Sequence, residues 1–139
     1  MSINKDFIDK LVRDIKESID TIKAYVSKPY EGLNEVEKYA IRYHLIVIAE
    51  ALMSAILHVV RRAFGFTPET PIHALSKLRD EGLISNEELR DITNIIKLRN
   101  LLVHRYWIID DRRVYENILK DFHNILTFIK RLQEYASRV

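Results

Sequence analysis

The stretch LIVIAEALMSAILHVV, residues 45–60, is apolar on almost every side of a helix and decides the fold. Its three polar side chains, Glu50, Ser54 and His58, are spaced by four residues, so on a helix they form one stripe. A helix this apolar is central, with neighbouring helices or a second subunit covering most of its surface. It is shorter than the roughly 20 apolar residues of a bilayer span, which predicts a buried helix and no membrane partner.

Capping signals extend this central helix and place four more around it. Asn34 is a good N-cap with Glu37 positioned for a capping box, and the helix ends near Phe64 at Gly65. The other expected helices run from Ile3 to Val26, from Thr70 to Gly82, from Ser85 into residues 98–107, and from about Asp111 to Ala136. Helical spacing predicts two outer core faces: Phe7, Ile8, Leu11, Val12, Ile15, Ile19 and Ile22 in the first helix, and Val114, Ile118, Leu119, Phe122, Ile125, Leu126, Ile129 and Leu132 in the last.

The composition favours a helical fold. The 139 residues are 47% apolar and 30% charged, with only three glycines and three prolines, which favours a few long helices over many short strands. Short linkers make sequential helices antiparallel neighbours. We therefore expect an all-α fold, a single domain over residues 1–139 built as an up-and-down antiparallel bundle of about five helices. The absence of Cys excludes disulfides and thiolate metal sites, and a charged N-terminus without an apolar signal core favours a cytoplasmic protein.

Positive charge gathers in one part of the chain. The overall net charge of +2 is too small to indicate a nucleic-acid binder. Residues 97–113 carry five Lys or Arg against two Asp, a net of +3 that leaves −1 for all other residues. This local excess could attract phosphate, although charge alone fits a scattered surface excess with no partner equally well.

Hydrogen-bonding groups are concentrated in the same region, within LRNLLVHRYW, residues 98–107. If the helix persists through this stretch, one arc of roughly 160° on a wheel of about 100° per residue holds Arg99, Asn100, His104 and Tyr106. An imidazole can transfer protons near neutral pH, and a guanidinium can hold phosphate oxygens. Because RNA supplies its own 2′-hydroxyl nucleophile, this set suits a metal-independent ribonuclease. One histidine cannot easily serve both ends of the reaction, so a two-fold dimer would bring two sets together.

Structural alternatives remain open at this stage. His104 could simply end a helix, and Tyr106 could belong to the core. Glu50 either orients Arg99 from behind or reaches solvent, because a carboxylate on so apolar a helix needs a partner or water. The remaining histidines are expected to be structural or solvated, and none has a metal-ligand spacing such as HxxxH: His44, His58, His73 and His123. No metal site and no cofactor are predicted.

The segment RNLLVHRY fits an Arg-x4-His-x-Tyr signature and resembles HEPN-domain proteins of the HepT-like toxin family. EKYAIRYHLIVIAEALMSAILHVV is similar to that family's second helix, and GFTPETPIHALSKLRDEGLIS to its following segment. RNLLVHRYWIIDDRRVYENI is similar to its signature region, so the resemblance covers about residues 34–120. It implies a HEPN-like helical bundle that dimerises, with the signatures of both subunits lining a cleft.

The same resemblance implies an activity and a partner. The activity would be that of a metal-independent endoribonuclease, the toxin of a type VII-like HEPN/MNT toxin–antitoxin pair. Arg99 and His104 would be the catalytic pair, with Asn100 in support. Tyr106 would match the tyrosine to which an MNT-type minimal nucleotidyltransferase antitoxin adds AMP, and the added phosphate would compete with RNA for Arg99. The alternatives are a non-catalytic nucleotide- or substrate-binding module beside such a nucleotidyltransferase, and a plain helical scaffold.

Overall fold

The computed structural model describes residues 2–139 and is helical throughout, with no strand among those residues. The α-helices are α1 (Lys5–Tyr25), α2 (Glu35–Phe64), α3 (Pro71–Asp80), α4 (Asn86–His104) and α5 (Asp111–Arg138). Two short 3₁₀ helices, η1 (Tyr30–Gly32) and η2 (Tyr106–Ile108), lie between them. The predicted all-α bundle of five helices is confirmed.

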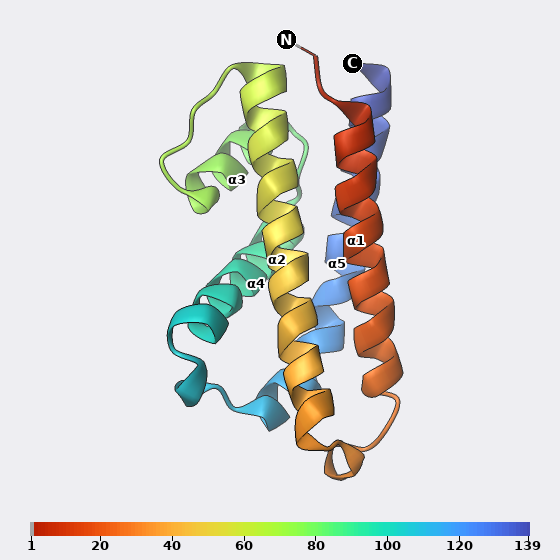
Figure 1. Ribbon diagram of the computed structural model, residues 1–139. Helices are drawn as coiled ribbons and strands as arrows, with labels where there is room; N and C mark the ends of the chain where they lie inside the picture. Colours follow the sequence, from red (N-terminus) through yellow and green to blue (C-terminus); the bar gives the residue numbers. More distant parts are fainter. Residues whose placement is uncertain (1) are drawn as a thin grey trace.

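The helix α2 is the centre of the bundle (Figure 1). It packs against α1, α3 and α4, while α5 packs against α1 and α4. The N- and C-terminal ends of the chain lie together at one end of the bundle, where Gln133 Nε2 donates to Asp9 Oδ1 at 3.0 Å. The turn η2 and the start of α2 lie toward the opposite end (Figure 1).

The predicted caps form at the helix ends. Asn34 and Glu37 make a capping box at the start of α2, and Ser85 with Glu88 makes another at the start of α4. Gly65 ends α2 with a φ of 61°, a left-handed conformation that glycine adopts without strain. Side-chain and backbone hydrogen bonds that satisfy the free ends of a helix therefore explain where these elements begin and end.

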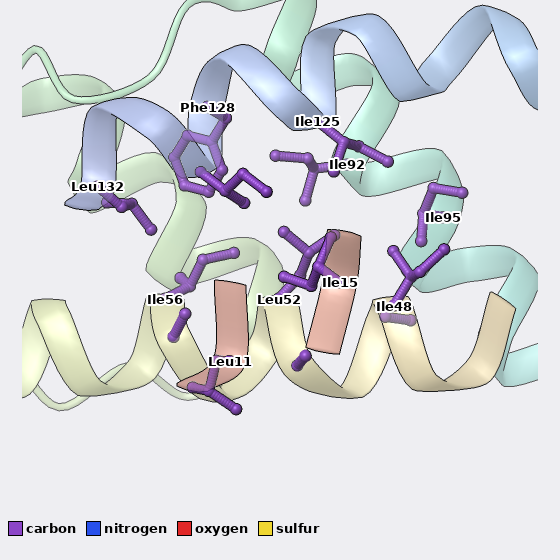
Figure 2. Packing of buried hydrophobic residues seen from close by; sticks show 14 of the residues in the cluster. Leu11, Ile15, Ile48, Leu52, Ile56, Ile92, Ile95, Ile125, Phe128 and Leu132 are labelled. Atoms are coloured by element: carbon purple, nitrogen blue, oxygen red, sulfur yellow. The ribbon is translucent and has the colours of Figure 1, made fainter. Parts of the chain in front are cut away.

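The core lies where α1, α2, α4 and α5 meet (Figure 2). Two residues expected there are exposed, Phe7 at 37% and Leu119 at 48%, and two more, Val114 and Leu126, are half-buried. Leu119 is turned about 100° from the buried Ile118, which directs it away from the bundle. Phe128, which was not expected in the core, is fully buried, because α5 is covered by α1 on one side and α4 on the other.

Neighbouring helices leave one stripe of α2 uncovered. Val36, Tyr39 and Tyr43 are 75%, 59% and 63% exposed, and further apolar residues along the same stripe are half-buried: Ile46, Val47, Met53 and Leu57. By length and composition alone α2 could cross a membrane, which for a single helix is weak evidence, and half of its most apolar window is buried inside the bundle. We call these seven exposed or half-buried residues the α2 stripe.

A buried polar network joins the first half of α4 to α5. The Glu88 carboxylate is 3% exposed and accepts hydrogen bonds from Arg131 and from the Thr127 hydroxyl. Burial alone would raise the pKa of Glu88, but these hydrogen bonds and one from the Ser85 backbone outweigh it and lower the pKa. One turn along α4, Asp91 accepts a hydrogen bond from Asn124 Nδ2 at 2.5 Å.

Candidate active site at the end of α4

The helix α4 ends at His104, inside the signature. The next residue, Arg105, leaves helical geometry with φ −140° and ψ 45°, although its N–H still donates to Leu101 O at 2.8 Å. The chain then makes the turn η2, so Tyr106 does not continue the helical arc that would place it beside Arg99. The predicted position of Tyr106 beside Arg99 required the helix to continue to Tyr106, and it does not.

Arg99 is held from two sides in the last turns of α4. Its Nε and a terminal nitrogen both lie 2.5 Å from Glu50 Oε1 on α2, and its Nη1 donates to Asn100 Oδ1 at 3.0 Å. The Arg99 side chain is 24% exposed and that of Glu50 is 48% exposed. Both alternatives considered for Glu50 therefore hold together, since its carboxylate pairs with Arg99 and also reaches solvent. The remaining guanidinium surface is available to an anion.

His104 is the last residue of α4 and is exposed. Within residues 2–139 its ring makes no hydrogen bond or ion pair with another side chain. Asn100 lies four residues before it, on the same face of the helix, and contacts Arg99.

A groove beside Arg99 offers space for a ligand. It measures about 670 Å³ and lies between α2, α4 and the start of α3. Glu50, Arg99 and Asn100 line it together with Lys97 and Ser54. Its wall thus combines two cations and the Glu50 carboxylate with apolar surface, and the excess of positive charge can accept a phosphate group and part of a nucleotide.

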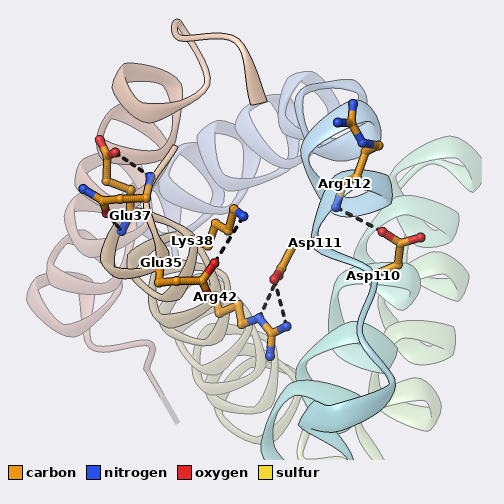
Figure 3. Close-up of polar contacts among 8 residues, drawn as sticks. Glu35, Glu37, Lys38, Arg42, Asp110, Asp111 and Arg112 are labelled. Carbon is orange, nitrogen blue, oxygen red and sulfur yellow. Dashed lines mark hydrogen bonds and ion pairs between the residues drawn. The ribbon is translucent and has the colours of Figure 1, made fainter. Parts of the chain in front are cut away.

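The turn η2 is fixed by a residue that the sequence analysis did not single out. Arg42 on α2 donates from Nη1 to the Tyr106 backbone oxygen at 3.2 Å, and from Nε and Nη2 to Asp111 at 2.8 and 3.1 Å. Figure 3 shows the two bonds to Asp111 at the start of α5. A lone arginine on the apolar face between Tyr39 and His44 was a signal for such a partner.

Three of the other histidines have local structural surroundings, and His123 is exposed. His58 Nε2 accepts the Asn4 N–H at 2.9 Å, and Ser18 Oγ lies 3.0 Å from His44 Nδ1. Burial lowers the pKa of both imidazoles, and the nearby Arg62 lowers that of His58 further. His73 Nδ1 accepts the Glu69 N–H at 3.3 Å. Among residues 2–139 no group of three or more His, Asp or Glu side chains is arranged to hold a metal ion.

Comparison with known families identifies the family to which the chain belongs. The model of the family described as Ribonuclease HepT-like matches residues 15–132, most of the chain. The protein belongs to the HepT-like ribonuclease family, which confirms the resemblance drawn from its sequence. A search of curated proteins gives no match.

Solved structures share this fold over nearly the whole chain. A chain of a toxin–antitoxin crystal structure with AMP-PNP aligns with a TM-score of 0.84 and 18% identity, over 93% of this chain and 98% of that one. YutE, a cytosolic protein of unknown function from Bacillus subtilis, aligns with a TM-score of 0.82 and 18% identity, over 97% and 92%. The structure of a tri-AMPylated Shewanella oneidensis HEPN toxin in complex with an MNT antitoxin aligns with a TM-score of 0.77 and 21% identity, over 90% and 97%. At these identities the likeness establishes the fold alone.

Proposed function

We propose that this protein is a cytoplasmic, metal-independent endoribonuclease, the toxin of a type VII-like HEPN/MNT toxin–antitoxin pair. The observation that carries the proposal is the arrangement of Arg99, held by Glu50 and Asn100, on the same helix end as an exposed His104. Membership of the HepT-like ribonuclease family gives this arrangement its reaction class.

The chemistry follows from what these side chains can do. Arg99 binds the non-bridging oxygens of an RNA phosphate and stabilises the negative charge that grows on them. His104 removes the proton of the 2′-hydroxyl, whose oxygen bonds to phosphorus as the bond to the 5′-oxygen breaks. A second imidazole, from a two-fold mate, returns a proton to the leaving 5′-oxygen. The products carry a 2′,3′-cyclic phosphate and a 5′-hydroxyl.

The α2 stripe supports the two-fold mate in this proposal. Its exposed members lie on the helix that also carries Glu50, so a second copy covering the stripe would bring the two Arg99 residues toward one cleft. We expect sedimentation to show a homodimer that becomes monomeric when Tyr43 and Leu57 are both replaced by Lys. That result would support the α2 stripe as the dimer interface. A dimer that survives the double substitution contradicts it.

Regulation by an MNT-type nucleotidyltransferase is proposed for Tyr106. The side chain is 60% exposed, so its hydroxyl is accessible to a modifying enzyme. An AMP group there would add negative charge and bulk next to the end of α4 and would compete with RNA. Coexpression with such an enzyme is expected to add the mass of AMP to the unaltered protein and not to Tyr106→Phe.

The direct test is cleavage of single-stranded RNA in the presence of EDTA by protein made without the nucleotidyltransferase. We expect cleavage with cyclic-phosphate ends, and its loss in His104→Ala. The alternative, a non-catalytic module that binds nucleotide or substrate beside a nucleotidyltransferase, is favoured by the open groove at Arg99. A dimer that binds nucleotide and leaves RNA intact would support that module instead.

A further inference from the structure

Trp107 is the only tryptophan of the chain, and it lies on the surface. It is 67% exposed, and its neighbours Tyr106 and Ile108 are 60% and 47% exposed. Val103, one turn earlier in α4, is 42% exposed as well. Large apolar side chains gathered in this way on a surface mark a binding site more often than chance.

The backbone of the turn η2 is tied to the bundle before any ligand arrives. Arg42 on α2 donates both to the Tyr106 backbone oxygen and to Asp111 at the start of α5. The rings of Tyr106 and Trp107 pack at 5.4 Å between centroids and at 82° to each other. A turn whose backbone is already ordered loses less conformational entropy when a ligand binds to it.

The charges around Trp107 indicate the class of ligand. Arg105 and Arg113 flank the turn, both are exposed, and within residues 2–139 neither side chain forms an ion pair. Burying unpaired cations against another protein would be costly, whereas the phosphates of a nucleic acid neutralise them. Aromatic side chains among cations are the usual means by which proteins bind single-stranded nucleic acid without sequence preference.

We propose that Trp107 is a stacking platform for an RNA base next to the phosphate bound at Arg99 and His104. The proposal rests on the proposed function, because it places the base by its distance along the chain from that site. Trp107 follows His104 by three residues, in the turn η2 that comes directly after the end of α4. We call the Arg42–Asp111 pair, together with its bond to the Tyr106 oxygen, the η2 clamp. Under this proposal the η2 clamp helps to position the substrate.

The probe for this test is a short 2′-O-methyl oligoribonucleotide, which has no free 2′-hydroxyl and cannot be cleaved by this chemistry. Because Trp107 is the sole tryptophan among seven tyrosines, fluorescence excited at wavelengths that tyrosine does not absorb reports on Trp107 alone. We expect the oligonucleotide to quench this fluorescence. Trp107→Ala should weaken the Kd, measured with a labelled oligonucleotide, by about tenfold or more, whereas Trp107→Phe should stay within about threefold because phenyl also stacks.

A second pair of variants tests the η2 clamp. Arg42→Lys keeps the charge but cannot hold both Asp111 oxygens and the Tyr106 carbonyl. It should lower the fluorescence anisotropy of Trp107 and weaken oligonucleotide binding severalfold. Lys38→Arg, one turn earlier in α2 and paired with Glu35 at 3.3 Å, is the matched control and should change neither.

Several outcomes would overturn stacking. An oligonucleotide that binds without altering Trp107 fluorescence would do so, as would unchanged affinity in Trp107→Ala. Loss of the dimer or of the nucleotidyltransferase complex in that variant, with RNA affinity intact, would make Trp107 a protein contact. Cleavage of ordinary RNA without any Trp107 response rejects only the platform. Trp107-dependent oligonucleotide binding by a protein that never cleaves RNA rejects the ribonuclease and supports the platform.

Discussion

The two halves of α4 use polar residues in opposite ways. In the first half, Glu88 and Asp91 are buried, and both accept hydrogen bonds from side chains of α5. In the second half and the turn that follows, His104 and Tyr106 are exposed, and Arg99 pairs with the Glu50 carboxylate. A single helix thus separates groups that hold the bundle together from groups that remain free to act on a ligand. Substitutions in each half should therefore change different measurements.

The largest effect is expected at the free end of α4. His104→Ala should lower the rate of RNA cleavage by about 10²- to 10⁴-fold, the usual contribution of a general acid or base. Because His104 is exposed, the free energy of unfolding should change by no more than about 0.5 kcal/mol. Single-turnover assays measure the cleavage rate, and urea denaturation measures the free energy of unfolding. Cleavage that persists in this variant would remove His104 from the mechanism.

In the buried first half of α4, a substitution should lower stability and leave RNA cleavage nearly unchanged. Glu88→Ala removes the partner of Arg131 and of Thr127, and should lower the free energy of unfolding by about 2 to 3 kcal/mol. Below its denaturation temperature the variant should still cleave RNA at a near-normal rate. Glu87→Ala, an exposed neighbour in the same turn, is the control and should be nearly neutral. A Glu88→Ala protein as stable as the control would show that the network contributes little.

A third test uses pH. Burial and the nearby Asp91 charge raise the pKa of Asp121 from 3.8 to about 6. Between those pH values the folded chain holds this proton more tightly than the unfolded chain, so this group's contribution to the free energy of unfolding falls as the pH rises. Asp121→Asn, which stays neutral, should therefore be more stable than the unaltered protein by about 1 kcal/mol at pH 7.5, a value reduced for partial exposure.

At pH 4 the Asp121→Asn protein and the unaltered protein should be almost equally stable, because the carboxyl group is then protonated in the folded state. Thermal denaturation across this pH range measures the difference. A constant difference from pH 4 to pH 7.5 would contradict the raised pKa.

The smallest effect should come from the one ion pair of the second half. Glu50→Gln weakens the hold on Arg99 and should reduce RNA cleavage by about three- to tenfold, while unfolding changes by less than about 1 kcal/mol because Glu50 is half exposed. Glu81→Gln, which loses a similarly exposed pair with Lys77 at 3.0 Å, should not affect cleavage. Equal cleavage by both variants would mean that Glu50 does not position Arg99.

The fold could be predicted from the sequence because its signals are local. Caps such as Asn34 and Ser85 satisfy backbone groups within one turn, and they place helix starts accurately. The end of α4 could not be placed in this way, because no Gly or Pro follows His104. The break at Arg105 accompanies a turn that is bonded to Arg42 of α2, a residue far away in sequence.

The candidate site was predictable in composition and less so in geometry. Arg99, Asn100 and His104 share a helix, so their order along it follows from the sequence. The contact between Glu50 and Arg99 could be named as one of two alternatives, since an apolar helix offers few partners for a carboxylate. The role of Arg42 needed the structure, because its bonds to Tyr106 and Asp111 join three elements whose relative positions only tertiary packing sets.

The meeting of both chain ends at one end of the bundle has a practical consequence. Asp9 and Gln133 bond there, while η2 lies toward the other end (Figure 1). A fluorophore, affinity tag or surface tether on either terminus would therefore sit far from the signature turn. A short peptide could also connect the two termini, so a backbone-cyclised version of this chain should be attainable with its groove still open.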